Sequence, residues 1–167
     1  MPTSVVHDQI PVLDVVGTGP TELAAFHDAL VDVDFGHYNL VRLSSVVPPR
    51  TAVDGTGKAD PPSGAHGDRL YCVYAAQTTA VPGEQAWAGI GWVQRLDGLG
   101  GYFVEHEGSS EQAVTTAIQR SLGHIAARED NPCTAPDWVV RGGTCVDDPI
   151  CALVIAPYEC QSWSGVG

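Results

Sequence analysis

The segment from Asn39 to Pro49 holds the residues whose types and spacing best suit chemistry. It reads Asn-Leu-Val-Arg-Leu-Ser-Ser-Val-Val-Pro-Pro, so an apolar strand ends in two serines and two prolines follow closely. Proline restricts its own backbone and that of the residue before it, which makes the chain rigid just after Ser45. A serine pair alone is an ordinary turn element, but here its hydroxyls lie in a constrained and apolar corner. This segment is therefore the first candidate for hydroxyl chemistry.

Other familiar catalytic patterns are incomplete in this sequence. The only lysine, Lys58, lies in a stretch rich in Gly and Asp, whereas pyridoxal phosphate needs a rigidly placed lysine. The turn Gly17-Thr18-Gly19 lacks the third glycine of a nucleotide-binding loop. Glu105-His106-Glu107 is expected on a strand, where successive side chains point to opposite faces and cannot all reach one metal ion. These patterns argue against pyridoxal phosphate, a nucleotide or a metal as cofactor.

Apolar periodicity divides the chain into helices and strands. Thr21 is a suitable cap for a helix with apolar residues at helical spacing, which is expected to end near Gly36. A second helix is expected after Ser109, which forms a capping box with Gln112. Strands are predicted at 10–16, 38–43, 69–80, 85–96, 102–107, 138–141 and 150–155. Two helices among runs of strands favour an α+β fold with a mainly antiparallel sheet.

The length of the chain predicts one domain, covering residues 1–167. Residues 46–68 are rich in Pro, Gly, Asp and Ala, and we expect them to form a long loop that is either functional or disordered. Residues 158–167 are expected to form a peripheral tail. No internal repeat and no second domain is expected.

The chain is acidic, with 8 Lys and Arg against 20 Asp and Glu and a formal net charge of -12. This charge argues against nucleic acid or an anionic membrane as partner and is compatible with a cationic ligand. No apolar run reaches the roughly 18 residues of a membrane span, and the N-terminus lacks the features of a signal peptide. We therefore expect a cytoplasmic protein. Its five cysteines, an odd number without a C-x-x-C pair, are expected to be free thiols.

The block from Asn39 to Pro49 resembles the pyruvoyl-dependent arginine decarboxylase family, whose pattern is Asn-Leu-x-Arg-x-Ser-Ser-x-x-Pro-Pro. The resemblance extends through Pro82-Gly83-Glu84 and through Glu105-His106-Glu107-Gly108, which is similar to the family's Glu-aromatic-Glu-Gly segment. The helix with Ala25-Phe26 also aligns without gaps, and the order of elements follows the family from about Ile10 to Pro157. The resemblance implies an αββα sandwich of two sheets covered by helices. It also implies a homotrimer or a dimer of trimers, with sites at subunit interfaces.

The same resemblance implies a proenzyme that cuts itself between Ser44 and Ser45, into chains 1–44 and 45–167. Ser45 would become a covalently bound pyruvoyl group, which forms a Schiff base with the substrate's amine and replaces both pyridoxal phosphate and a metal. The implied reaction is an amino-acid decarboxylation. Its default substrate is L-arginine, a small cationic amino acid, which gives agmatine and carbon dioxide.

Two further residues receive roles in this chemistry. Glu105 takes the position of the family's proton donor, and it shares a strand face with Phe103 and Glu107, where apolar cover and a like charge raise the pKa of a carboxyl. Asn39 lies six residues before Ser45, and strand alternation places both on one face. Asn39 is therefore expected to donate to the oxyanion or to position the substrate.

The substrate-binding position departs from the family pattern. In the family an acidic residue directly follows the helix phenylalanine, and here that position holds His27. Helix geometry turns the next residue, Asp28, away from this face, whereas Asp34 lies nearer to it. His27 and Asp34 are therefore the candidate substrate-binding residues. Two alternatives remain open, namely the same chemistry on another amino acid and a non-catalytic relative that serves as a binding or assembly subunit.

Overall fold

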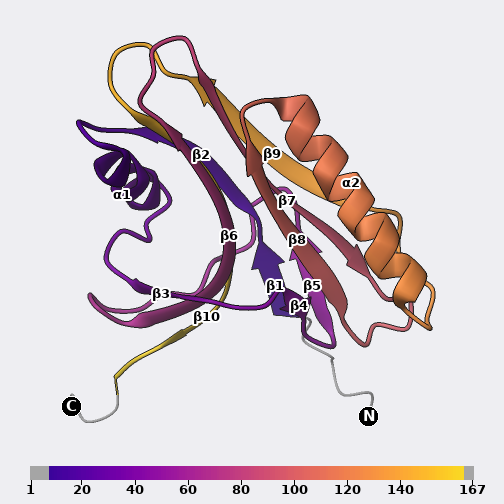
Figure 1. Ribbon diagram of the computed structural model, residues 1–167. Helices are drawn as coiled ribbons and strands as arrows, with labels where there is room; N and C mark the ends of the chain where they lie inside the picture. The colour runs from indigo at the N-terminus through magenta and orange to yellow at the C-terminus, as the bar shows by residue number, and fades with distance from the viewer. Residues whose placement is uncertain (1–7, 164–167) are drawn as a thin grey trace.

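Two sheets, each covered by one helix, make up the fold of the computed structural model, which describes residues 8–163 (Figure 1). The strand order is β2-β10-β6-β3 in the first sheet and β4-β8-β7-β9 in the second, while β1 and β5 form a separate parallel pair. Neighbouring strands in both sheets are antiparallel except for β3 and β6. The elements are β1 (Asp8–Pro11), β2 (Leu13–Thr18), α1 (Glu22–Asp32), β3 (Asn39–Arg42), β4 (Val46–Val47), β5 (Thr51–Asp54), β6 (Arg69–Thr79), β7 (Gln85–Gln94), β8 (Gly101–Gly108), α2 (Glu111–Arg128), β9 (Asp137–Thr144) and β10 (Ile150–Gln161).

Three clusters of buried apolar side chains hold the four layers together. One lies between the sheets and includes Val73, Val154 and Phe103. The second joins α1 to the first sheet, and the third joins α2 to the second sheet. Each sheet has two apolar faces to remove from water, so one face packs on the other sheet and one on a helix. The predicted α+β class and αββα sandwich are confirmed.

The helix starts follow from the capping residues. The Thr21 hydroxyl accepts a hydrogen bond from the Ala24 N–H at 3.0 Å, as the sequence predicts. The second helix is capped by Ser110, whose hydroxyl accepts from the Ala113 N–H at 3.1 Å, and the prediction of Ser109 was wrong by one residue. Both serines are chemically suitable caps, and the extended backbone at Ser110 decides between them. Neither helix of the described chain is long and apolar enough to cross a membrane.

Residues 46–68 are more ordered than the long loop that we predicted. They contain β4, which pairs with β8, and β5, which pairs with β1. The predicted strand 10–16 is accordingly split in two, because β1 belongs to that small sheet and β2 to the first large one. Both β4 and β5 are short, and Pro48 and Pro49 lie between them, so the local sequence resembles a loop. Only pairing with distant strands makes these segments strands.

The end of the chain also differs from the prediction. Residues 158–161 continue β10, so the peripheral tail predicted for 158–167 begins later than expected. Tyr158 packs against the cluster between the sheets. The cause is long-range, since β10 pairs along its length with β6 and is extended by it beyond the apolar run that defines it in the sequence. Residues 164–167 lie outside the described part of the chain.

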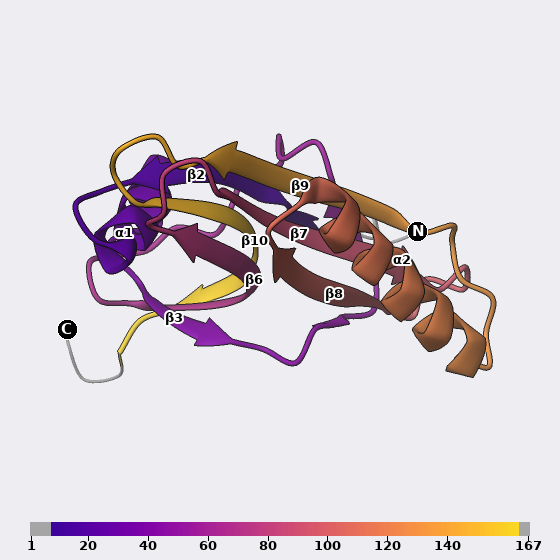
Figure 2. The same ribbon diagram turned by 45° about the horizontal axis from the view of Figure 1, so that its top comes forward.

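The chain crosses from one sheet to the other between β3 and β4 (Figure 2). Leu43 is still held by the first sheet, because its N–H donates to the Cys72 carbonyl at 2.9 Å. Ser45 is already held by the second sheet, because its carbonyl accepts from the Phe103 N–H at 2.8 Å. The serine pair therefore lies at the covalent bridge between the two sheets.

Candidate active site

Ser45 adopts an uncommon backbone conformation at this bridge. Its φ is 75°, in the left-handed region that costs a residue with a β-carbon roughly 1 to 2 kcal/mol. The contacts of Leu43 and Ser45 with different sheets hold the turn in place. The peptide bond between Ser44 and Ser45 is thus part of a strained connection. Breaking that bond would relieve the strain.

The Ser45 hydroxyl donates a hydrogen bond to the Glu105 carboxylate, with 2.5 Å between Oγ and Oε1. Glu105 lies on β8, where alternation sends its side chain toward the first sheet, as for Phe103. The next residue, His106, points the other way and contacts the Ser121 hydroxyl of α2 at 2.7 Å. The strand predicted from the sequence thus has Glu105 on the correct face. The packing of the two sheets against each other brings its side chain to Ser45.

Burial is the largest influence on the Glu105 carboxyl and raises its pKa. The hydrogen bond from Ser45 and the positive charge of Arg42 lower this pKa, while the charge of Glu107 raises it, and the result lies above the ordinary value. A carboxyl with a raised pKa can accept a proton in one step and return it in another. The direction of the shift agrees with the expectation from the sequence.

Two charged side chains on either side of Glu105 bind the free edge of β6. Pairing between β3 and β6 ends at Arg42 and Cys72, which leaves the following backbone groups of β6 without a partner strand on that side. The Arg42 guanidinium donates to the Tyr74 carbonyl at 2.5 Å and lies 4.3 Å from the centre of the Tyr74 ring. The Glu107 carboxylate accepts from the Ala76 N–H at 3.0 Å. The edge of β6 thereby fixes the two charges that act on Glu105.

We expect the substitution Arg42→Gln to move the pH-titration profile of the Glu105 carboxyl, followed by NMR, to higher pH. The positive charge of Arg42 lowers the pKa of Glu105, so its removal raises that pKa further and keeps Glu105 protonated to higher pH. Arg42→Lys retains the charge and is the matched control. Because Arg42 is exposed, the shift should be largest at low ionic strength. Coincident profiles for Arg42→Gln and Arg42→Lys at low salt would contradict this expectation.

Within the described chain no hydrogen bond joins three other predicted residues, Asn39, His27 and Asp34, to Ser45 or Glu105. Asn39 begins β3, and its side-chain amide donates to the Gly67 carbonyl at 2.8 Å. Its predicted contact with the oxyanion or substrate stays a prediction. Ser44 is exposed beside Ser45. His27 is exposed on α1, which packs on the face of the first sheet opposite to the face that meets Glu105.

Asp34 has a structural role that the sequence analysis did not identify. It follows α1 with a φ of 65°, and its N–H donates to the Val31 carbonyl at 3.0 Å. The Phe35 N–H donates to the Leu30 carbonyl at 2.8 Å, which completes a Schellman motif at the end of the helix. Asp28 is also engaged, since its carboxylate accepts from the Thr18 N–H at 2.9 Å. A role of Asp34 in substrate binding stays a prediction.

Two residues at the site, Arg42 and Tyr158, have roles that the sequence analysis did not identify. The effect of the Glu107 charge on Glu105 was expected, whereas the contact of Glu107 with β6 was not. The Tyr158 hydroxyl donates to the carbonyl of Val46, the residue directly after Ser45, at 2.9 Å. No local pattern signals such a contact, because it joins residues far apart in the sequence.

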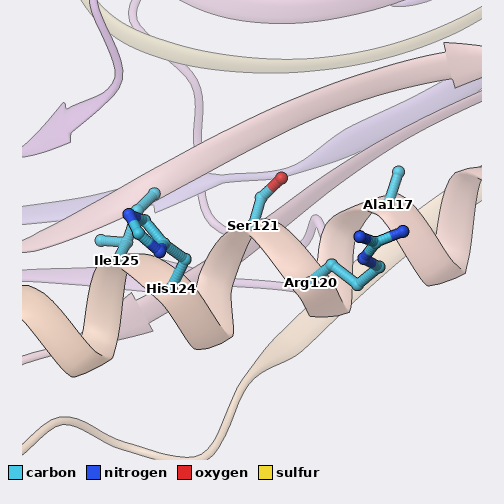
Figure 3. A pocket seen from close by; sticks show the side chains of 5 residues that line it. All are labelled: Ala117, Arg120, Ser121, His124 and Ile125. Atoms are coloured by element: carbon cyan, nitrogen blue, oxygen red, sulfur yellow. The ribbon is translucent and has the colours of Figure 1, made fainter.

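Two hollows on the surface differ in their relation to the serine pair. A cavity of about 1080 Å³ borders Pro48, Pro49 and Tyr158, and it includes three carboxylates, of Asp8, Asp60 and Glu159. A groove of about 570 Å³ runs along α2 and is lined by Ala117, Arg120, Ser121, His124 and Ile125 (Figure 3). The groove lies on the helix side of the second sheet, whereas Glu105 faces the other side. The acidic cavity is therefore the one next to the candidate site.

Comparison with known proteins identifies the family of this chain. Residues 9–147 match the family model for pyruvoyl-dependent arginine decarboxylase. A protein of that name from Halobacterium salinarum is 45% identical over 150 residues, which cover 85% of this chain and 88% of the relative. Another from Archaeoglobus fulgidus is 35% identical over 98 residues, 56% of this chain and 59% of the relative. A solved pyruvoyl-dependent histidine decarboxylase is 16% identical, with a TM-score of 0.43 over 59% of this chain and 52% of that one.

The chain thus belongs to the pyruvoyl-dependent class of decarboxylases. More narrowly, the chain belongs to the pyruvoyl-dependent arginine decarboxylase family. The resemblance noted in the sequence is confirmed. The region that the family model matches ends at residue 147, so β10 lies beyond it.

Proposed function

We propose that this protein cleaves itself between Ser44 and Ser45 and then decarboxylates L-arginine to agmatine and carbon dioxide. The observation that carries the proposal is the contact between Ser45 Oγ and Glu105 Oε1, at 2.5 Å. It joins a nucleophile in a strained turn to a group that can accept its proton. The names of the relatives support the substrate.

The cleavage can be written with chain residues alone. Glu105 takes the proton from Ser45 Oγ, which attacks the carbonyl carbon of Ser44. Glu105 then returns this proton to the former peptide nitrogen, which leaves as an amine while an ester forms. Loss of the Ser45 α-proton then expels Ser44 as a carboxylate and leaves dehydroalanine at position 45. Hydrolysis of that residue releases ammonia and gives the pyruvoyl group on the chain that begins at 45. The products are chains 1–44 and 45–167.

The residues around Ser45 fit a pyruvoyl group at this position. The carbonyl oxygen of residue 45, which remains as the amide next to the new ketone, accepts the Phe103 N–H at 2.8 Å. That donor withdraws electrons from the amide. When present, the group supplies a carbonyl that reacts with the substrate's amine and accepts the electron pair as carbon dioxide leaves. In this proposal Glu105 delivers a proton to the substrate carbon, and its contact with residue 45 supports that role.

Two features bear on the substrate and the assembly. The cavity beside Tyr158 contains three carboxylates, and the chain carries a net charge of -12, which favours a cationic substrate. Ser44 is exposed in the single chain, and a neighbouring subunit would exclude water from it. The proposed assembly is accordingly a homotrimer or a dimer of trimers with sites at subunit interfaces, and the proposed location is the cytoplasm.

The proposal is tested by the intact mass of the purified protein and by its release of carbon dioxide from labelled arginine. We expect two chains whose masses correspond to cleavage after Ser44. The larger should resist Edman sequencing, because a pyruvoyl end has no free amine. A protein that remains a single chain after prolonged incubation would exclude self-processing. A cleaved protein that releases nothing from arginine would leave the chemistry but overturn the substrate.

One observation favours another amino acid as substrate. The position of the family's acidic residue holds His27, and this side chain is exposed on α1. It could reach Ser45 only across a subunit interface. A guanidinium buried there without a carboxylate partner costs several kcal/mol. The second candidate function is therefore the same chemistry on a different amine-bearing amino acid.

We expect His27→Asp to lower the Michaelis constant for arginine by about tenfold, which corresponds to one charge-assisted hydrogen bond. His27→Ala is the control, because it removes the imidazole without adding a carboxylate. Steady-state kinetics on arginine and on a panel of other amino acids would measure the effect. Efficient wild-type turnover of arginine, unchanged in both variants, would show that His27 has no part in substrate choice.

A further inference from the structure

Tyr158 lies at a β-bulge in β10, beyond the region that the family model matches. Along β10, Ile150, Ala152, Val154 and Ala156 face the core between the sheets, and Tyr158 packs against the same core. The register with β6 shifts between Pro157 and Glu159, and Cys160 packs on the α1 side. A bulge inserts one residue and changes which face the following side chains take. Tyr158 is the last residue of this strand that packs against the core between the sheets.

The contacts of Tyr158 join the two sheets at the serine pair. Its hydroxyl donates to the Val46 carbonyl on β4 at 2.9 Å, and its ring lies 6.0 Å from the Phe103 ring on β8. Burial raises the pKa of the Tyr158 hydroxyl, and the nearby charge of Glu105 raises it further. The hydroxyl therefore remains a donor at neutral pH. This contact links β10 of the first sheet to β4 of the second.

Cleavage changes the importance of this link. In the uncut chain residue 45 is tied on one side to Leu43, which the Cys72 carbonyl anchors to the first sheet, and on the other side to Val46. After cleavage the first tie is gone. The new end of the larger chain then keeps its hydrogen bond to Phe103, and its only covalent connection is to Val46, whose carbonyl accepts the hydrogen bond from Tyr158. The hydrogen bond from Tyr158 to Val46 therefore takes over the role of the peptide connection between the two sheets that cleavage removes.

We propose that Tyr158 is a positioning residue that holds the pyruvoyl-bearing end of the processed chain against Phe103 and Glu105. The inference rests on the proposed self-cleavage. Tyr158 touches neither the reacting bond nor a group that transfers a proton. Its effect passes through Val46 to the orientation of residue 45. A misplacement of about 1 Å at a reacting group can reduce turnover by as much as 10²-fold.

The test compares Tyr158→Phe in two backgrounds, the self-processed protein and the uncut variant Ser45→Ala. The readout is hydrogen exchange of the Phe103 amide, whose acceptor is the carbonyl of residue 45. Tyr71→Phe is the matched control, because the Tyr71 hydroxyl donates to Gln161 at 2.9 Å, at the far end of β10. In processed protein we expect Tyr158→Phe to speed this exchange by about tenfold and Tyr71→Phe to leave it unchanged.

In the uncut background the same substitution should change the exchange by less than about threefold, because the covalent bridge still holds residue 45. In processed enzyme kcat for the preferred amino acid should fall about 10- to 100-fold, with the Michaelis constant changed less than about threefold. Equal acceleration in both backgrounds would assign Tyr158 a purely structural role and overturn the inference. Unchanged exchange in processed protein would also overturn it.

The proposed function fails in a distinguishable way. A wild-type chain that never cuts itself, as read by intact mass, would remove the proposed function and this inference together. If the wild-type protein cuts itself but its Phe103 amide exchanges hydrogen as fast as in Tyr158→Phe, the proposed function stands. Only the role of Tyr158 is then removed.

Discussion

The Ser45→Ala variant is expected to remain one uncut chain of 167 residues and to have no decarboxylase activity. The hydroxyl that contacts Glu105 is the only group of residue 45 that can attack the Ser44 carbonyl, and alanine lacks it. Without cleavage residue 45 cannot become a ketone, so the loss should be complete and not partial. Denaturing electrophoresis and intact mass measure the first effect, and carbon dioxide release measures the second.

The fold of Ser45→Ala should survive, because the substitution removes one hydroxyl and leaves the half-buried Glu105 with one partner fewer. Such a loss costs on the order of 1 to 3 kcal/mol. Ser44→Ala is the matched control. Ser44 contributes its carbonyl carbon to the reaction and not its hydroxyl, so this variant should still cleave. Cleavage of Ser45→Ala at the same bond, or failure of the wild type to cleave, would exclude Ser45 as the nucleophile.

The Glu105→Gln variant should lose roughly 10² to 10⁴ in kcat for decarboxylation, the usual range for a general acid. An amide cannot deliver a proton to the substrate carbon. From the sequence, Glu105 was assigned to this step alone. The 2.5 Å contact with Ser45 adds a second effect, because the amide also accepts the hydroxyl proton poorly, so processing should be slower. Kinetics must therefore be measured per mole of cleaved chain.

Glu107→Gln is the control for that experiment. Glu107 accepts from the Ala76 N–H, and its charge raises the pKa of Glu105. Neutralising it should lower the Glu105 pKa and move the pH profile to lower pH, with a much smaller change in maximal rate. Full activity of Glu105→Gln would show that another group protonates the product, with Glu107 or a water molecule as the next candidates.

Local sequence was sufficient for the elements that carry the site. Alternation along 102–107 placed Glu105 on the face of Phe103, and apolar spacing identified the buried face of α2, with Val114, Ile118 and Leu122. The Thr21 cap was also correct. These features depend on residues a few positions apart, because strand alternation and helix periodicity are properties of the local backbone. The serine block with its two prolines was equally visible as a rigid strand end.

Only the tertiary structure decided how these parts meet. Sixty residues separate Ser45 from Glu105, and their contact depends on the stacking of the two sheets and on the pairing of Val46 with Tyr102. The left-handed φ of Ser45 has the same origin, because the chain must leave one sheet and enter the other within three residues. Nothing in the types of those residues requires that conformation.

The same reason explains the contacts that sequence analysis missed. Arg42 and Glu107 bind β6 only because β3 stops at Arg42 and leaves an edge with free backbone groups. Tyr158 reaches Val46 only because alternation along β10 turns it toward the core between the sheets, where the stacking of the sheets brings β4 close. Local patterns determined which residues could do chemistry, namely the two serines and Glu105. Long-range strand pairing decided which groups surround them, because register and sheet packing depend on contacts between distant parts of the chain.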